Sequence, residues 1–361
     1  FTFVAYALHL NRPTGHFNIL ALSLFFILLI FDPLLLFHVG FQLSYAAVFA
    51  IVWIFPLLKN IWAPKSWLLR KGWEVTAVSI AAQLGVLPIT LFHFHQFPGL
   101  FILSSLLIIP PLTFILGLGI LVIFLALINT LPSFLVVLYN TIIHWMNSII
   151  AWIAQQENFL IRNISFDAVQ LLLTYGIIIS CVSILTKISY KKVLCFTIFI
   201  LALQFWGLGI KYQVNRKESL FIAHISRNSA LIHQSGPKIT IYGNNIPATE
   251  RLAVDYGIAL NIGKFINRPL KNSYILGKER IIVLDSSFVS LPAICGAFTL
   301  WLTQSPKINL ERLLDSVRPK VVIADGNNYR SSIRRWKLTC MKKKVPFHFT
   351  GEKGAYIFKL P

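Results

Sequence analysis

Residues 31–58 read FDPLLLFHVGFQLSYAAVFAIVWIFPLL, which is two apolar runs joined by a short interruption. The first run ends at Asp32-Pro33, because proline lacks the amide proton that a continuing helix needs. The second run carries Gln42 and Ser44 in a segment that is otherwise apolar enough for lipid. A polar side chain without a partner is costly in hydrocarbon, so we expect both groups to face protein or water.

His38-Val39-Gly40 forms the interruption between the two runs. Glycine adopts backbone angles that other residues avoid, and it lets a second backbone approach closely. Gly40 is therefore expected either to turn the chain tightly or to contact a neighbouring segment. Together with Gln42 and Ser44, this arrangement indicates a polar-lined path through a membrane.

The composition of the whole chain places it among membrane proteins. Of its 361 residues, 56% are hydrophobic and only 13% are charged, whereas a soluble domain carries about a quarter charged residues. The formal net charge is +20, of which +5 falls in residues 1–210 and +15 in residues 211–361. We therefore predict a polytopic helical membrane bundle over residues 1–210, followed by a small soluble α/β domain over residues 211–361.

Apolar runs of about 20 residues, the length that crosses a bilayer, mark the spans of the bundle. The candidate spans are residues 17–36, 41–58, 73–91, 99–128, 132–155, 168–186 and 193–210, and residues 1–10 resemble the end of a helix whose start is missing. The run 99–128 is longer than one straight crossing and contains Pro110-Pro111. Because two prolines remove two helix hydrogen bonds, a discontinuous or re-entrant segment is expected there.

Basic residues predict which ends of the spans face the cytoplasm. They gather in the loops 59–72 and 187–192, which we therefore place on the cytoplasmic side. With the run 99–128 taken as one net crossing, an even number of spans separates the two loops, as this placement requires. His38, residues 93–96 and the C-terminal tail then lie on the opposite side.

Polar side chains inside apolar spans are candidates for the lining of the path, because a membrane seldom accommodates them without a function. Asn140, His144 and Asn147 recur at the spacing of one helix face. Each such residue has a second interpretation, a hydrogen bond that joins neighbouring helices. The lining candidates from the rest of the domain are Asp32, His38, Gly40, Gln42, Ser44, Gln83, His93, His95, Gln96, Pro110 and Pro111.

His93-Phe94-His95-Gln96 follows the span 73–91. Two histidines at alternate positions of a strand share a face and can bind a metal ion. No cysteine, aspartate or glutamate lies nearby in the sequence, and mixed aromatic and polar residues are usual at a membrane interface. A structural belt and a contact at the mouth of the path are the alternatives, and we predict no metal.

The tail alternates strand and helix patterns. Strands are expected at residues 220–224, 238–242, 281–285, 320–324 and 355–359, and helices at residues 310–317 and 329–343. The last helix is strongly basic. Basic side chains interleaved with aromatic ones bind single-stranded nucleic acid through phosphates and stacked bases, although a solvated cationic face near anionic lipid has the same composition. The DNA-contact candidates are Arg330, Arg334, Arg335, Trp336, Lys337, Lys342, Lys343 and Lys344.

Asp32-Pro33, followed by Val39-Gly40-Phe41-Gln42-Leu43-Ser44-Tyr45, resembles the signature of the ComEC competence family. The resemblance implies a multi-pass protein of the bacterial inner membrane, with a periplasmic tail, that passes single-stranded DNA into the cytoplasm during natural transformation. It also implies partners: the lipid bilayer, a periplasmic DNA-binding protein, a cytoplasmic helicase-type motor and further copies of the chain. In that family a soluble domain and more helices precede this segment, so an N-terminally truncated fragment is expected.

Residues 305–359 resemble the end of a metallo-β-lactamase-like domain, with which many members of that family end. The H-x-H-x-D-H motif of that domain does not occur in the tail, Thr303-Gln304-Ser305-Pro306 stands in place of His-His-Gly-Ser, and Arg330-Ser331-Ser332 stands in place of Gly-His-Pro. We therefore expect a shortened, metal-free tail without cofactor or enzymatic activity. Cys295 and Cys340 could pair if the tail is extracytoplasmic, which the sequence leaves open.

Two other functions fit parts of the sequence. A secondary transporter for another solute would use the break at Pro110-Pro111 as its binding site. A membrane protein with only a structural role, and without DNA transport, would account for the missing metal ligands.

Overall fold

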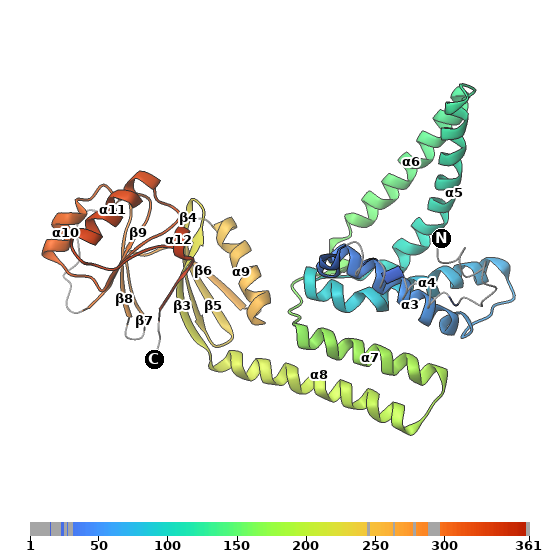
Figure 1. The fold of residues 1–361 in the computed structure, drawn as a ribbon, viewed down its shortest axis with the longest axis horizontal. Helices are drawn as coiled ribbons and strands as arrows, with labels where there is room; N and C mark the ends of the chain where they lie inside the picture. The colour runs from blue at the N-terminus through green and yellow to red at the C-terminus, as the bar shows by residue number, and fades with distance from the viewer. Residues whose placement is uncertain are drawn as a thin grey trace. The chain divides into compact units, whose positions relative to one another are not determined.

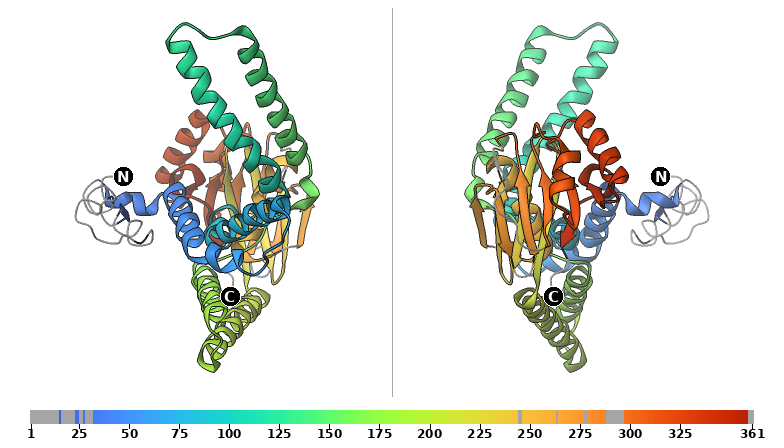
Figure 2. Two further views of the ribbon diagram at one scale, coloured as in Figure 1. Left: turned by 90° about the vertical axis from the view of Figure 1, so that its right-hand side faces the viewer. Right: turned by 90° about the vertical axis from the view of Figure 1, so that its left-hand side faces the viewer.

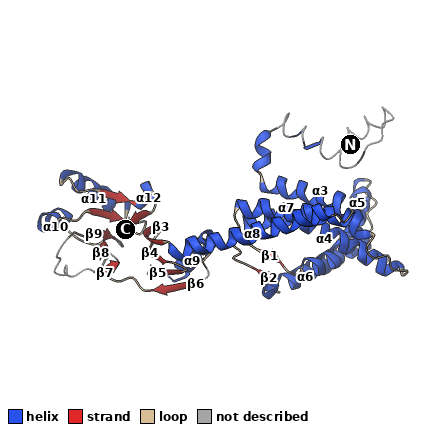
Figure 3. Cartoon of the chain, turned by 90° about the horizontal axis from the view of Figure 1, so that it is seen from below, coloured by secondary structure: helices blue, strands red, loops and turns tan. Residues whose placement is uncertain are grey.

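Figure 1 shows the computed structural model, which describes residues 15, 23–24, 27, 32–243, 246–262, 264–276, 279–287 and 297–358. The chain forms two compact units, Phe1–Trp206 and Gly207–Pro361. The division falls close to residue 210, where the charge of the sequence changes. Figure 3 shows that helices build the first unit and that nearly all strands belong to the second.

Six helices in the described part of the chain are long and apolar enough to cross a membrane. They are α3 (Val39–Lys59), α4 (Trp67–Phe94), α5 (Phe101–Leu127), α6 (Ser133–Ala154), α7 (Ala168–Thr186) and α8 (Tyr190–Arg216). Two short 3-10 helices, η2 (Pro33–Phe37) and η3 (Glu157–Phe159), precede α3 and follow α6. The two-residue strands β1 (Phe97–Pro98) and β2 (Leu160–Ile161) pair antiparallel, which ties the start of α5 to the segment after α6.

These helices confirm six of the seven predicted spans. The remaining span, residues 17–36, lies mostly outside the described residues, and so does the partial helix at residues 1–10. The helix α4 begins at Trp67 rather than at residue 73, so the basic loop before it is shorter than predicted.

The ion pairs of Glu74 account for this extension of α4. Its carboxylate lies 3.0 Å from Lys71 Nζ on the same helix and 3.1 Å from Lys59 Nζ at the end of α3. The first turns of α4 are thereby joined to the end of α3, which favours helix over loop at these positions.

The predicted break at Pro110-Pro111 is wrong, because both prolines lie inside the continuous helix α5. Each proline removes its own amide hydrogen bond, but its fixed φ angle still fits a helix. Membrane helices tolerate such losses where hydroxyl groups and neighbouring helices satisfy nearby polar groups. In α5, Thr113 Oγ1 donates a hydrogen bond of 3.2 Å to the carbonyl of Ile109, which adds a bond to the turn that contains the prolines without replacing the two that they remove. Figure 2 shows α5 and α6 as an antiparallel pair joined at one end.

The helices α3, α4 and α7 pack around small residues. The buried cluster that they share consists of Ala50, Ile54, Ala81 and Val182. A Cβ atom added at Gly85 would lie 2.5 Å from the carbonyl oxygen of Ala46, so only glycine lets α4 approach α3 this closely. The hydroxyl of Tyr175 on α7 donates a hydrogen bond of 2.8 Å to the carbonyl of Gly85. Gly85 therefore joins all three helices.

The second unit is a sandwich of two five-stranded sheets (Figure 1). In the order β12-β3-β4-β5-β6, the first sheet contains β12 (Tyr356–Phe358), β3 (Glu218–Ile225), β4 (Asn228–Ser235), β5 (Lys238–Gly243) and β6 (Lys264–Arg268). In the order β11-β10-β9-β8-β7, the second sheet contains β11 (Phe347–Phe349), β10 (Val321–Ala324), β9 (Thr299–Leu302), β8 (Glu279–Leu284) and β7 (Ser273–Leu276). The helices are α9 (Ile246–Leu260), α10 (Leu310–Ser316), α11 (Arg330–Lys342) and α12 (Thr350–Lys353).

Three apolar cores hold the layers of the sandwich together. The core between the sheets contains the fully buried Trp301. The helix α9 covers the outer face of the first sheet through Ala253, and α10 and α11 cover the outer face of the second sheet through Leu314 and Trp336. The layers therefore follow the order helix, sheet, sheet, helix.

The strands β8, β9, β10 and β11 run parallel to one another. Their carboxyl ends therefore meet at one edge of the second sheet, and the loop after β10 lies at that edge. Residues 325–329 form this loop and lead directly into α11. This connection brings the predicted basic helix next to the end of the sheet.

The structure confirms the five predicted strands, at residues 220–224, 238–242, 281–285, 320–324 and 355–359, as β3, β5, β8, β10 and β12. It also confirms the two predicted helices as α10 and α11. The remaining strands and α9 were not predicted. The strand β9 shows why, because its four residues, TLWL, include one β-branched side chain, whereas the predicted β10, VVIA, includes three. Cys340 is a free, fully buried cysteine, and Cys295 lies outside the described residues.

Candidate functional site

The first candidate site lies where α3 begins and α4 ends. Asp32 Oδ1 accepts a hydrogen bond from the amide of Leu34 at 2.8 Å and so caps η2. Gln42 Nε2 donates to the carbonyl of Leu36 at 2.8 Å, and Gln42 Oε1 lies 3.4 Å from His93 Nε2. The fold thus brings together two predicted residues, Gln42 and His93, that are far apart in the sequence.

His95 ties the same end of the bundle to the segment after α6. Its backbone lies in the left-handed region, with φ of 55°, where it ends α4. His95 Nδ1 lies 3.1 Å from the carbonyl oxygen of Ile164, and the amide of Ile164 donates to the carbonyl of His95 at 2.9 Å. Because His93 is helical and His95 is left-handed, the two rings do not share the face of a strand.

Several other predicted lining residues do not join this cluster. His38, Gly40 and Ser44 are exposed, whereas Gln83 and Gln96 are half-buried. The turn expected at Gly40 is wrong, since Gly40 lies in the first turn of α3. A Cβ atom added at Gly40 would meet nothing within 4 Å among the described residues, so no described segment approaches it closely. A helix N-terminus needs no glycine, so the residue can be present without a conformational role.

Asn140, His144 and Asn147 lie on one exposed face of α6, as their spacing predicts. They form neither a hydrogen bond nor an ion pair through their side chains in the described part of the chain. Both interpretations of these residues, path lining and contact with another helix, need an exposed polar face.

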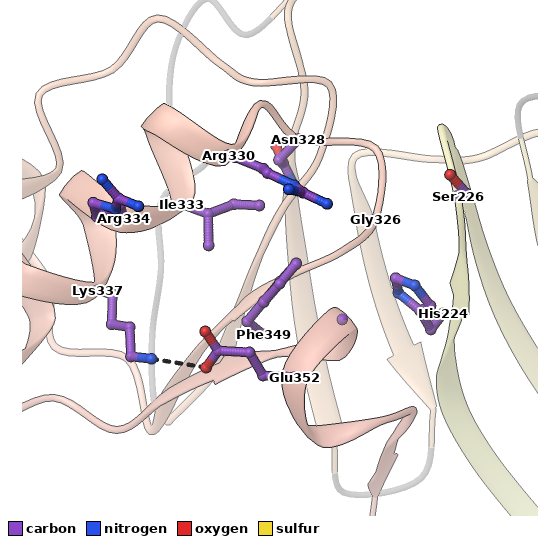
Figure 4. A pocket seen from close by; sticks show the side chains of 11 residues that line it. His224, Ser226, Gly326, Asn328, Arg330, Ile333, Arg334, Lys337, Phe349 and Glu352 are labelled. Atoms are coloured by element: carbon purple, nitrogen blue, oxygen red, sulfur yellow. Dashed lines mark hydrogen bonds and ion pairs between the residues drawn. The ribbon is translucent and has the colours of Figure 1, made fainter.

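The second candidate site is a cavity of about 540 Å³ in the second unit (Figure 4). Three segments that are distant in the sequence form its walls: the end of β3, the loop after β10 with α11, and the start of α12. The lining residues are His224, Ser226, Gly326, Asn328, Arg330, Ile333, Arg334, Lys337, Phe349, Gly351 and Glu352.

The predicted basic cluster divides between different faces of α11. Arg330, Arg334 and Lys337 recur at helical spacing and line the cavity. Arg335 is exposed over a different hollow, beside Lys307. The eight DNA-contact candidates are therefore not one continuous surface.

Acidic residues of α10 neutralise the last turn of α11. Lys342 Nζ lies 2.9 Å from Glu311, and Lys343 Nζ lies 2.6 Å from Asp315. The hydrogen bond from Lys342 lowers the pKa of Glu311, and the hydrogen bond to Asp315 raises the pKa of Lys343. Both lysines therefore hold α11 to α10, whereas Lys344, which follows, is exposed.

Trp336 is not available to stack on a base, so that prediction is wrong. Only 1% of the residue is exposed, and its side chain belongs to the core beneath α11. The exposed aromatic residue next to the basic helix is Tyr329, which is 75% exposed. The sequence pattern of alternating basic and aromatic residues does not distinguish a stacking tryptophan from one that anchors the helix.

A buried carboxyl group that the sequence analysis missed lies directly behind the cavity. Asp325 is fully buried at the end of β10. Its Oδ2 accepts a hydrogen bond of 3.0 Å from Trp301 Nε1, and its Oδ1 accepts bonds of 3.1 Å from the Asn327 amide and 2.9 Å from Asn328 Nδ2. Burial raises the pKa of Asp325 to about 6, although hydrogen bonds with Ser229, the Asn327 amide, Thr303 and Trp301 oppose the shift.

Asn328 transmits this network to the wall of the cavity. Its Nδ2 also donates to the carbonyl of Leu302 at 2.8 Å, and its Oδ1 accepts from the amide of Ser305 at 2.8 Å. The loop after β10 is thereby fixed to the end of β9. The sequence signal for this arrangement is Asp325-Gly326-Asn327-Asn328 directly after a β-branched strand, since Asp and Asn side chains bond to backbone amides two residues later.

Among the described residues, no group of three or more His, Cys, Asp or Glu side chains is placed to hold a metal ion. The lining of the cavity contains one histidine, His224, and one carboxylate, Glu352. The chemistry available there is therefore that of guanidinium, ammonium, imidazole and amide groups, which bind anions and hydrogen-bond acceptors.

The six apolar helices and the appended sandwich define a multi-pass membrane protein with a separate α/β domain. A family model described as "Competence protein" matches residues 1–187, and a model described as "ComEC C-terminal domain" matches residues 220–360. The chain belongs to the competence protein family.

A known protein supports this relationship. The chain is similar to ComE operon protein 3 of Bacillus subtilis (strain 168), with 32% identity over 139 residues. The similar segment covers 38% of this chain and 17% of that relative. No solved structure matches the chain.

Proposed function

We propose that this chain forms part of the path by which single-stranded DNA crosses the bacterial inner membrane during natural transformation. The match of residues 1–187 to the competence family carries the proposal. The match of residues 220–360 to the C-terminal domain of ComEC proteins supports it, because both parts of the chain then point to the same system.

The electrostatics of the first unit suit the passage of a polyanion. Residues 1–206 contain four carboxylates, Asp32, Glu74, Glu157 and Asp167. Glu74 pairs with two lysines, and Glu157 lies 3.4 Å from the Arg162 guanidinium. The other two carboxylates accept hydrogen bonds at the starts of η2 and α7. Cations thus offset two of the four acids, and nine lysine and arginine residues against four acids leave residues 1–206 with a net positive charge, which attracts phosphate groups.

The connections between helices support the predicted orientation. If each long helix crosses the membrane once, the loops 60–66 and 187–189 lie on one side, and residues 95–100, residues 155–167 and the end of α8 lie on the other. Basic residues flank the first two loops, which places them in the cytoplasm by the positive-inside rule. The C-terminal domain is then periplasmic.

We assign to the C-terminal domain the role of holding DNA without cutting it. This role rests on the sequence motifs, in which Arg330-Ser331-Ser332 replaces Gly-His-Pro and the first metal-binding motif is missing. A periplasmic DNA-binding protein would deliver the strand, and a cytoplasmic helicase-type motor would supply the energy. The alternative of a secondary transporter loses its main support, because it depended on a break in α5.

Uptake of labelled DNA into the cytoplasm of a gene-deletion strain tests the proposal. Deletion should abolish the nuclease-protected label, and the gene supplied in trans should restore it. The variant Gln42→Glu places a carboxylate in the His93 cluster and should reduce uptake at least about tenfold by repelling phosphates. Gln155→Glu adds the same charge at an exposed helix end and serves as the matched control.

Two results would contradict the proposal. Normal uptake in the deletion strain would remove the chain from the transport path altogether. Equal uptake by the Gln42 and Gln155 variants, at equal protein levels in the membrane, would mean that the strand does not pass the end of α3.

A further inference from the structure

The cavity beside α11 combines groups that sequence patterns alone do not bring together. His224 comes from the end of β3, Arg330 from the start of α11 and Phe349 from the end of β11. Figure 4 shows His224 and Arg330 on opposite sides of the cavity, with Ile333 and Phe349 between α11 and α12. The cavity thus has two polar walls and an apolar floor.

The positive charge of the cavity is only partly neutralised. Lys337 Nζ lies 2.7 Å from Glu352, so these two groups compensate each other at one end (Figure 4). No carboxylate in the described part of the chain forms an ion pair with Arg330 or Arg334. A free guanidinium group is the preferred protein partner of a phosphate, because its fork of N–H groups matches two oxygens.

Close backbone contacts hold the opposite wall in place. A Cβ atom added at Gly326 would lie 2.9 Å from His224 Cε1, so glycine lets the loop after β10 approach the end of β3. His224 Nδ1 lies 3.0 Å from Thr350 Oγ1, which orients the ring and leaves Nε2 for another partner. The network of Asp325 fixes the loop from behind. The wall is therefore built before any ligand arrives.

The floor of the cavity suits a flat apolar group. Ile333 is buried, and Phe349 is half-buried, so both present carbon atoms toward the cavity. Aromatic side chains next to cationic ones are the recurring arrangement by which proteins hold a base and its phosphate. The volume of about 540 Å³ falls within the range of small-molecule sites.

We propose that this cavity binds one nucleoside monophosphate unit. Arg330 contacts the phosphate, Arg334 adds positive charge at the rim, the base lies against Phe349 and Ile333, and His224 offers a hydrogen bond to the base or sugar. Because Glu352 pairs with Lys337, that end of the cavity offers no free cation to a second phosphate, so the site takes a single unit rather than a continuous backbone. The unit comes either from the end of a DNA strand, which rests on the proposed function, or from a free nucleotide.

Binding experiments on the full chain in detergent micelles test this assignment. The probes are thymidine 5′-monophosphate, thymidine, inorganic phosphate, and a short oligothymidylate with and without a 5′-phosphate. The monophosphate should bind more tightly than either thymidine or phosphate, because only it contacts both the guanidinium and the floor. Arg330→Gln should weaken its binding at least about tenfold, and Phe349→Leu should weaken it less.

Arg335→Gln is the matched control, since it removes the same charge from the same helix but away from the cavity. It should change the affinity for the monophosphate by less than about twofold. Equal losses in the Arg330 and Arg335 variants, or equal binding of thymidine and its monophosphate, would overturn the assignment. Circular dichroism of each variant establishes that α11 is intact.

The oligonucleotides separate the two sources of the unit. Tighter binding of the 5′-phosphorylated oligothymidylate than of the unphosphorylated one indicates a strand end, whereas binding of the monophosphate alone indicates a free nucleotide. If the chain binds no monophosphate but deletion of its gene abolishes DNA uptake, only this assignment is refuted. If the chain binds the monophosphate but DNA uptake continues after deletion of its gene, only the proposed function is refuted.

Discussion

The buried carboxyl group of Asp325 should make the stability of the C-terminal domain depend on pH. The pKa of this group rises from its ordinary 3.8 to about 6 in the folded domain, because burial disfavours the charged form. The folded domain therefore retains the proton more strongly than the unfolded chain does. The stabilisation is complete below pH 4, and it is lost as the pH rises through about 6.

The size of the effect follows from the shift itself. A rise from 3.8 to about 6 corresponds to about 3 kcal/mol, at about 1.4 kcal/mol for each unit. Asp325→Asn removes this titration. Between about pH 4 and pH 7.5, the free energy of unfolding should therefore fall by about 3 kcal/mol less in the variant than in the native chain. In the variant, the side-chain amide at position 325 would face N–H donors from both Trp301 and Asn328. Its own NH₂ group cannot accept a hydrogen bond, so the variant should lose one bond and be less stable than the native chain at about pH 4.

Hydrogen exchange of the full chain in detergent micelles, measured across a urea series, provides the assay. Peptides from β9 and β10 report on the sandwich alone, independently of the membrane helices. Asp255→Asn is the matched control, because Asp255 is exposed on α9 in the same domain. A variant at position 325 with the same pH dependence as the native chain would show that Asp325 is ionised in the folded domain throughout this range, and the burial argument would fail.

Two further predictions concern the helical unit. Gly85→Leu should lower the thermal midpoint of the unit in micelles, by a destabilisation of about 1–3 kcal/mol, because its side chain would collide with Ala46 on α3. Gly117→Leu on α5 should not, because a Cβ atom at Gly117 meets nothing within 4 Å in the described part of the chain. Asp167→Ala should destabilise the start of α7 by about 1–2 kcal/mol, since Asp167 and Gln170 form a capping box, and faster hydrogen exchange confined to the first turn of α7 is the expected readout. Unchanged exchange there would show that the cap is dispensable.

Sequence reasoning predicted those features that depend on local composition. The membrane spans follow from the lengths of apolar runs, because lipid excludes charge from about 20 consecutive residues. The helix predicted at residues 310–317 is α10, and Asn309 caps it by accepting a hydrogen bond of 3.2 Å from the amide of Arg312. The sequence alone likewise predicts that α11 is basic. These properties need only neighbours along the chain.

The tertiary structure decided whatever depends on the partners of a residue. The sequence predicts a helix break at Pro110-Pro111, yet α5 continues through both prolines. The sequence predicts that Trp336 stacks on a DNA base, yet its side chain is buried in the core beneath α11. In both cases the same residue fits two environments, and only the surrounding elements select one.

By itself, the sequence determined that the chain is a bundle of membrane helices with a basic α/β tail, because hydropathy and charge are sums over neighbouring residues. Only the tertiary structure decided which groups meet. His224 and Arg330 are over one hundred residues apart, and they share a cavity because β3 and the loop after β10 belong to two sheets stacked on one core. That stacking depends on long-range contacts, which leave no periodic pattern in the sequence.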